Sequence, residues 1–118
     1  MPRFVILEHN HPTLHWDFML ESGGVLKTWR LPAPPPASTE AAVPLGDHRL
    51  AYLDYEGPVS GSRGVVRRWD AGEYDTVQRD EATWEVRLRG QRWQGTALIA
   101  EGSVGQARIV FITEPRTK

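Results

Sequence analysis

The chain of 118 residues contains no cysteine. This absence excludes disulfide bonds, thiolate metal ligands and cysteine nucleophiles together. It fits a reducing compartment, so we expect a cytoplasmic protein.

Long hydrophobic runs and an excess of one charge sign are missing as well. The apolar run at residues 4–7 is too short for a signal peptide or a membrane span, so we expect no membrane contact. The formal net charge of −1 provides no overall attraction to nucleic acid. Any such binding would depend on a local patch or on recognition of a strand end. No phosphate-cradling glycine loop or nucleophile elbow is found.

The chain length and turn residues predict one all-β domain over residues 1–118. Nine prolines and eleven glycines favour many turns and short strands. The strand-like segments are residues 3–7, 14–20, 25–31, 49–55, 62–70, 82–90, 92–100 and 107–113. About eight short strands indicate a small antiparallel β-barrel or a sandwich, and closure of a barrel would remove exposed edges.

The proline-rich segment at residues 32–44 is expected to be a surface loop. Its prolines lack the amide hydrogen that a central strand needs. We expect it to be a spacer, with a short turn of helix at residues 38–42.

The stretch HNHPTLHWDFMLE, residues 9–21, combines histidines with strict alternation. Alternation places His15 and Asp17 on one face of a strand, and Leu14, Trp16, Phe18 and Leu20 on the other. Ser22, Gly23 and Gly24 predict a tight turn into the strand at residues 25–31. Centring this hairpin on Gly23 would place Lys27 opposite Met19, and Trp29 opposite Asp17.

The shared face of His15 and Asp17 suggests a metal site. Imidazole and carboxylate are suitable ligands for Mn²⁺, Fe²⁺, Co²⁺ or Zn²⁺, and His9 or His11 could supply a second imidazole. Such a site would hold a phosphate or activate a water molecule. The alternative is that these polar residues simply form the solvated face of the strand.

A second cluster is formed by His48 and Tyr52. We expect both on one face of a strand, where they could hydrogen-bond a phosphate or a leaving oxygen. The residues alone favour a simpler interpretation, in which Tyr52 is a packed aromatic and His48 is a turn residue. The arginines at residues 63–68 and 87–92 could form basic stripes, but nearby acidic residues favour a paired, solvated surface.

Three ordered blocks of the chain resemble a known family. They are residues 4–32 (FVILEHNHPTLHWDFMLESGGVLKTWRLP), 47–57 (DHRLAYLDYEG) and 64–74 (GVVRRWDAGEY). Together they are similar to the 3′-phosphoesterase domain of bacterial DNA ligase D, an enzyme of non-homologous end joining. The resemblance implies a compact β-barrel with the site in a surface groove.

The resemblance also implies an activity and its site. It implies a manganese-dependent phosphoesterase that removes a 3′ ribonucleotide and then a 3′-phosphate from DNA or RNA–DNA ends, with other end-joining proteins as partners. By the matching motif, His9, His15 and Asp17 would hold the metal, while His48 and Tyr52 would contact the phosphate. Zn²⁺ and Co²⁺ are alternative ions for such ligands.

The chain departs from the family pattern where that pattern has charge. Met19 stands where an arginine would grip the scissile phosphate, and Gly46 stands in place of a glutamate. We expect Lys27 to replace the missing charge, in preference to Arg30. The departures leave two alternatives open: a module of the same fold that binds DNA ends or repair partners without catalysis, and a phosphoesterase of small molecules.

Overall fold

The computed structural model describes residues 1–102 and 104–115 of the chain, and nearly all regular structure there is β. The strands are β1 (Arg3–His9), β2 (His15–Ser22), β3 (Val25–Leu31), β4 (Thr39–His48), β5 (Gly57–Pro58), β6 (Val65–Arg79), β7 (Thr83–Gly90), β8 (Gln94–Glu101) and β9 (Ala107–Thr113). A single turn of 3₁₀ helix, η1 (Leu50–Leu53), follows β4. None of the described residues lies in a helix long and apolar enough to cross a membrane.

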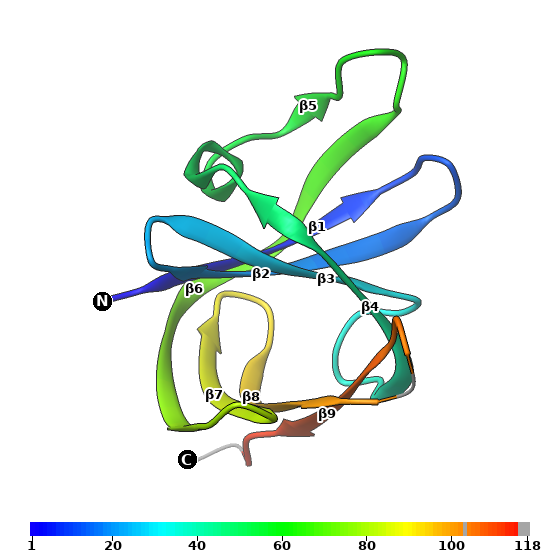
Figure 1. The fold of residues 1–118 in the computed structure, drawn as a ribbon. Coiled ribbons are helices and arrows are strands. Elements are labelled where there is room, and N and C mark those ends of the chain that lie inside the picture. The colour runs from blue at the N-terminus through cyan, green and yellow to red at the C-terminus, as the bar shows by residue number, and fades with distance from the viewer. Residues whose placement is uncertain (103, 116–118) are drawn as a thin grey trace.

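Eight of the strands close into an antiparallel barrel. They follow the order β1-β2-β3-β4-β9-β8-β7-β6, and β6 pairs back onto β1 (Figure 1). The short β5 pairs with the first residues of β6, beyond the part that contacts β7. Closure pairs the edges that an open sheet would expose. The predicted all-β barrel of about eight strands is confirmed.

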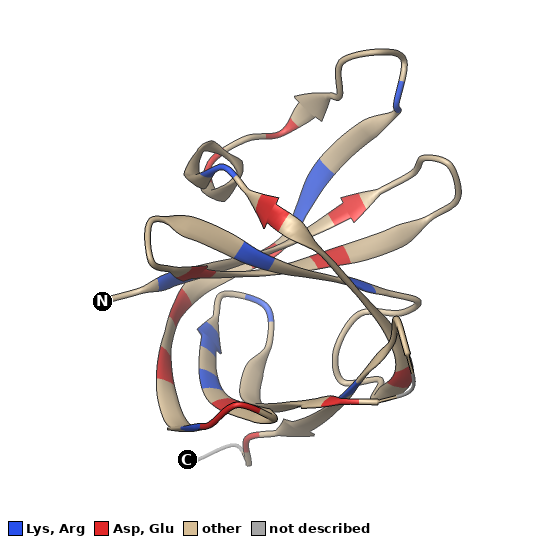
Figure 2. Ribbon diagram, in the orientation of Figure 1, with Lys and Arg blue, Asp and Glu red and all other residues tan. Residues whose placement is uncertain are grey.

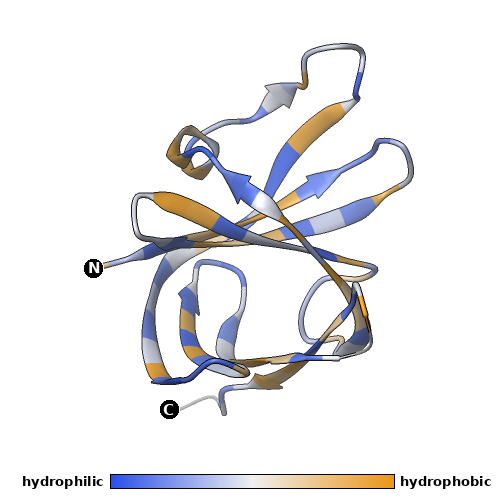
Figure 3. Ribbon diagram, in the orientation of Figure 1, coloured by the Kyte–Doolittle hydropathy of each residue, from blue (hydrophilic) through white to orange (hydrophobic). Residues whose placement is uncertain are grey.

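The sheet formed by β1, β2 and β3 is covered on both faces. Phe4, Phe18 and Leu31 point into the barrel, where they join the main apolar cluster. The other face carries a second cluster that is completed from outside the barrel, and its members are Val5, Leu7, Met19, Leu26, Leu53 and Val66. Strands that build only the barrel wall alternate instead, as the banded colouring of β7 shows (Figure 3). The segment from η1 to β6 therefore covers part of the outer face of this sheet.

The hairpin between β2 and β3 has a different register from the predicted one. Gly23 and Gly24 both have positive φ, at 63° and 81°, and form a two-residue turn in which Ser22 pairs with Val25. The prediction centred the turn on Gly23 alone and was wrong by one residue. Leu20, not Met19, lies opposite Lys27. A shift of one residue reverses the face of every side chain in the partner strand.

Two further predictions were wrong. Strand β4 begins at Thr39, inside the segment expected to be a loop with a helical turn. It accommodates Pro44 because β4 pairs with β9 only at Thr39 and Ala42, which leaves one edge unpaired farther along. Residues 49–55 form no strand: Leu50–Leu53 is a 3₁₀ turn that directs Leu53 into the second cluster.

Strand β6 extends nine residues past its predicted end at residue 70, to Arg79. It is long because it serves two partners, pairing with β1 over Val66–Glu73 and with β7 over Gly72–Arg79. At Gly72 a Cβ would lie 2.1 Å from the Arg89 carbonyl oxygen, so only glycine allows the two strands to approach this closely.

A buried carboxylate joins β6 to the turn between β7 and β8. Asp70 is 3% exposed, and its oxygens accept hydrogen bonds from the backbone amides of Ala71 (2.8 Å), Arg92 (2.9 Å) and Trp93 (2.9 Å). Trp93 packs into the main cluster. The carboxylate thus satisfies amides that would otherwise be buried without an acceptor.

Asp70→Ala is expected to lower the free energy of unfolding by about 3 kcal/mol, because it leaves buried amides without their charged acceptor. Urea denaturation measures the change. Asp75→Ala is the matched control: Asp75 lies on the same strand in an exposed ion pair with Arg89, so its loss should cost less than about 1 kcal/mol. Equal effects of the two substitutions would contradict the role given to Asp70.

Candidate active site

A groove lies on the outer face of β1, β2 and β3, beneath the segment that carries η1. Its volume is about 250 Å³. The polar side chains that line it are His9, His11, Asp17, Arg30, His48, Tyr52 and Arg63. The second apolar cluster contributes Leu7, Met19 and Val66 to the same lining. The groove is therefore a polar opening on an apolar base, which is the usual composition of a small-ligand site.

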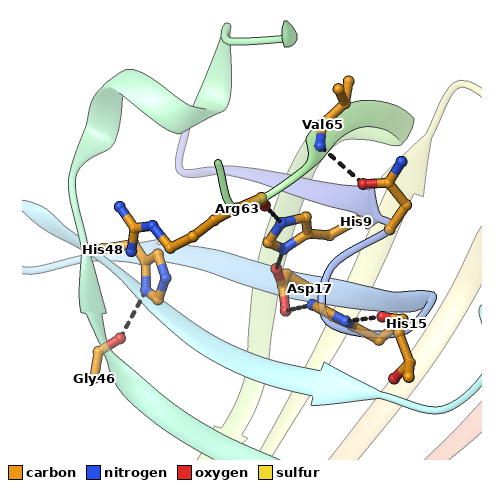
Figure 4. Close-up of polar contacts among 9 residues, drawn as sticks. His9, His15, Asp17, Gly46, His48, Arg63 and Val65 are labelled. Carbon is orange, nitrogen blue, oxygen red and sulfur yellow. Dashed lines mark hydrogen bonds and ion pairs between the residues drawn. The ribbon is translucent and has the colours of Figure 1, made fainter. Parts of the chain in front are cut away.

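The pairing of β1 with β2 brings His9, His15 and Asp17 together. His9 lies directly opposite His15 in the ladder, and Asp17 is opposite Leu7, on the same face. One ligand atom from each residue lies within 4.8 Å of the others. The two imidazoles flank the carboxylate (Figure 4), with His15 Nε2 3.4 Å from Asp17 Oδ1 and His9 Nδ1 3.7 Å from Asp17 Oδ2.

Two backbone carbonyls orient the imidazoles. His9 Nε2 donates to the Arg63 carbonyl at 2.7 Å, and His15 Nδ1 donates to the Thr13 carbonyl at 2.8 Å. A carbonyl oxygen can only accept, so the proton of each neutral ring sits on that nitrogen. The other nitrogen, His9 Nδ1 or His15 Nε2, keeps its lone pair and faces Asp17. This arrangement is typical of histidines that ligate a metal.

The three residues fit a divalent cation better than they fit one another. His15 and Asp17 are 4% and 6% exposed, yet His15 Nε2 and Asp17 Oδ1 have no hydrogen-bond partner in the described chain. Their separation of 3.4 Å is too long for a good hydrogen bond. Two atoms bound to one ion at about 2.1 Å each would lie about 3.0–3.4 Å apart. Burying such groups without a partner is costly, and a shared cation would supply the partner.

His11 lies apart from this cluster. It is exposed, and among the described residues only His9, His15 and Asp17 bring possible ligand atoms within 4.8 Å of one another. Of the two histidines that the sequence offered as a second imidazole, the geometry therefore favours His9. The metal-ligand role itself stays a prediction.

His48 and Tyr52 face the same groove, although not from a common strand. His48 ends β4 and Tyr52 lies in η1, so the strand spacing that we expected was wrong. Their rings nevertheless lie 5.8 Å apart, edge to face. His48 Nδ1 donates to the Gly46 carbonyl at 2.8 Å, which leaves Nε2 free for a ligand (Figure 4).

An ion pair attaches η1 to the barrel. Arg3 of β1 donates to the Asp54 carboxylate at 2.7 Å, immediately after η1. The hydrogen bond from Arg3 lowers the pKa of Asp54. A lowered pKa means that this contact stabilises the fold above the ordinary aspartate pKa and is lost as the pH falls through the lowered value. Both side chains are exposed, so the contact orients η1 more than it stabilises the fold.

Lys27 does not reach the groove. It shares the inner face of the sheet with Leu20 and pairs with Asp47 at 3.1 Å. The expectation that Lys27 replaces the charge missing at Met19 therefore loses its basis, because it rested on the wrong register. Met19 itself is 2% exposed and packs in the second apolar cluster.

Arg30 is the cation that the register brings to this face. It lies opposite Asp17 and lines the groove. The sequence contained a signal for this position: two consecutive glycines are typical of a two-residue hairpin turn, which would have paired residue 17 with residue 30.

Comparison with known proteins gives a consistent family. The model of the DNA ligase D 3′-phosphoesterase domain matches residues 7–101. The multifunctional non-homologous end joining DNA repair protein LigD of Mycobacterium tuberculosis is 41% identical over 102 residues, covering 78% of this chain and 13% of that protein. The LigD protein of Pseudomonas aeruginosa is 38% identical over 78 residues, covering 61% of this chain and 9% of that protein. The chain thus spans a small part of the length of these relatives.

Mn²⁺ is expected to raise the melting temperature of the wild-type protein. Ligand at 100 times its dissociation constant stabilises a fold by about 2.7 kcal/mol. His15→Gln removes one ligand atom and should abolish most of this increment, and chelation should reverse it in the wild type. Thermal unfolding with and without Mn²⁺ measures the increment in each variant separately, so that any intrinsic loss of stability cancels.

His11→Gln is the matched control for this experiment. It removes a histidine of the same segment that lies outside the cluster, so the increment should equal that of the wild type. An increment unchanged by His15→Gln, or one abolished by His11→Gln, would contradict the ligand set.

Proposed function

Because the chain belongs to the DNA ligase D 3′-phosphoesterase family, we propose that it hydrolyses phosphoesters at the 3′ ends of nucleic-acid strands. The observation that carries this proposal is the trio of His9, His15 and Asp17, whose potential ligand atoms lie within 4.8 Å of one another. Two of these atoms, His15 Nε2 and Asp17 Oδ1, are buried without a hydrogen bond in the described chain. A cation held there would lie beside a groove lined by His48 and Tyr52.

The ion that we propose is Mn²⁺. Two imidazoles and one carboxylate without sulfur suit Mn²⁺, and also Zn²⁺ or Co²⁺. When bound, a divalent ion polarises a phosphoryl oxygen and acidifies a coordinated water. His9 and His15 contribute neutral ring nitrogens, and Asp17 contributes the negative charge that favours a cation over an anion at this end of the groove.

The other groove residues would act on the phosphoryl group. His48 keeps Nε2 available, so in its protonated form it can donate a hydrogen bond to a charged oxygen or a proton to the leaving one. Tyr52, which also lines the groove, offers a phenolic hydroxyl and would orient the phosphate. The Arg63 carbonyl keeps His9 in the tautomer that ligation requires.

The substrate that we propose is the 3′ end of DNA or of an RNA–DNA strand, in the cytoplasm and with other end-joining proteins as partners. The relatives named LigD are described as end-joining proteins, which supports this class of substrate. Charges of both signs are mixed over the barrel strands (Figure 2), so contact with a nucleic acid would be local to the groove. Recognition of a strand end needs only such a local contact.

A second function is favoured by one observation. Met19 is buried among apolar side chains and offers no charge to a phosphate where the family pattern has an arginine. A domain with weakened chemistry could still bind DNA ends or repair partners. A small-molecule phosphoester is a further alternative, and a substrate affinity that does not change with salt would favour it over DNA.

The primary test is an end-processing assay. A 5′-labelled primer–template that ends in a 3′ ribonucleotide or a 3′-phosphate should be shortened or dephosphorylated by the wild-type protein when Mn²⁺ is present. His15→Ala should abolish the reaction, and His48→Ala should reduce it about 100-fold, as is typical for loss of a general acid or a charge-stabilising donor. Gel analysis of the labelled products measures both effects.

Binding of the same primer–template over a salt series serves as the control. Binding without turnover at high protein concentration would contradict the proposed hydrolysis and would favour a domain that binds DNA ends without catalysis. If the protein neither binds nor processes the primer–template, a small-molecule phosphoester becomes the favoured substrate.

A further inference from the structure

Arg30 lines the groove but belongs neither to the cluster of His9, His15 and Asp17 nor to the apolar residues at the base of the groove. Its Cα lies opposite that of Asp17 in the β2–β3 ladder, so both side chains leave the sheet on the groove side. His48 and Tyr52 line the same groove. The positively charged side chain of Arg30 thus lies in the same groove as Asp17, one of the three residues that we propose to bind the metal ion.

The guanidinium of Arg30 is uncommitted. Its Nε is buried and has no hydrogen-bond partner in the described part of the chain. Several other arginines pair with carboxylates, namely Arg3, Arg87, Arg89 and Arg108. Arg63, the other arginine of the groove, already donates to the carbonyl and the hydroxyl of Ser60 at 2.7 and 3.0 Å. Arg30 is therefore the groove arginine whose donors are available to a ligand.

A buried donor without a partner costs free energy, and an anion in the groove would remove that cost. A guanidinium presents two parallel N–H groups that match two oxygens of a phosphate. Met19 lies two residues from Asp17 on this face and is neutral, so it neither competes for the anion nor binds it.

We propose that Arg30 is a catalytic residue that binds the non-bridging oxygens of the substrate phosphoryl group. It supplies from β3 the positive charge that this groove lacks at Met19. The proposal rests on the proposed phosphoesterase function. Arg30 would stabilise the charge on the phosphoryl oxygens while the ester bond breaks, and it would not itself bind the metal.

The test uses the full chain and compares wild type with Arg30→Gln and Arg30→Lys. Arg108→Gln is the matched control, because it removes an arginine from an exposed ion pair with Glu40 on β4 and β9, outside the groove lining. One readout is kcat/KM on the 3′-phosphate primer–template with Mn²⁺. A second readout is the affinity of the metal-free protein for inorganic phosphate, measured by titration of backbone amide NMR signals. A third is the dissociation constant for Mn²⁺.

Arg30→Gln should lower kcat/KM about 100-fold, in the range seen when one preorganised donor to a charged oxygen is removed. It should weaken phosphate binding about 10-fold, while the dissociation constant for Mn²⁺ changes less than about twofold, since a charged hydrogen bond is lost and no metal ligand is. Arg30→Lys keeps the charge without the paired N–H groups and should fall between wild type and Arg30→Gln. Arg108→Gln should match the wild type.

Wild-type phosphate affinity in folded Arg30→Gln would overturn the proposal. If thermal unfolding shows that Arg30→Gln does not fold, Arg30→Lys decides, because unchanged turnover and phosphate affinity in that variant would exclude the paired contact. Absence of turnover in the wild-type protein would instead contradict the proposed phosphoesterase function. The phosphate titration would still show in that case whether Arg30 binds a phosphate.

Discussion

The antiparallel register between β1 and β2 is the constraint on which both the barrel and the site depend. It sets His9 against His15, and Leu7 against Asp17, on the outer face of the sheet. The same register sends Phe18 into the barrel. Because side chains alternate, a slip of one residue would turn the ligand atoms inward and the apolar residues outward. The packing of the barrel interior therefore helps to fix the geometry of a polar site on the opposite face of the same strands.

The polar cluster is costly to a protein without a bound cation. His15 and Asp17 are buried, and each has a ligand atom without a hydrogen bond in the described chain. The carbonyls of Thr13 and Arg63 direct the ring protons away from Asp17, so the lone pairs converge. A surface that was simply solvated would need neither the burial nor this orientation. The arrangement is better explained by a ligand than by the stability of the fold.

Sequence reasoning succeeded where a pattern was local. Alternation predicted β2 and the faces of His15 and Asp17, and β9 was found with its observed bounds. It failed where local patterns compete. The segment containing Leu50 and Leu53 resembles a strand, yet a spacing of three serves a 3₁₀ turn that buries Leu53. Pro44 argued against a strand, but a free edge of β4 accommodates it.

The sequence by itself determined the all-β class, the donors available to a metal and the family, because composition, alternation and ordered motifs are properties of the chain. Only the tertiary structure decided that Arg30, and not Lys27, lines the groove. That choice depends on one residue of hairpin register, which places Arg30 beside Asp17 and leaves Lys27 on the other face with Asp47. Tertiary structure also brought His48 and Tyr52 to the groove from two different elements. Contacts between distant segments follow from strand pairing and closure of the barrel, which no local pattern specifies.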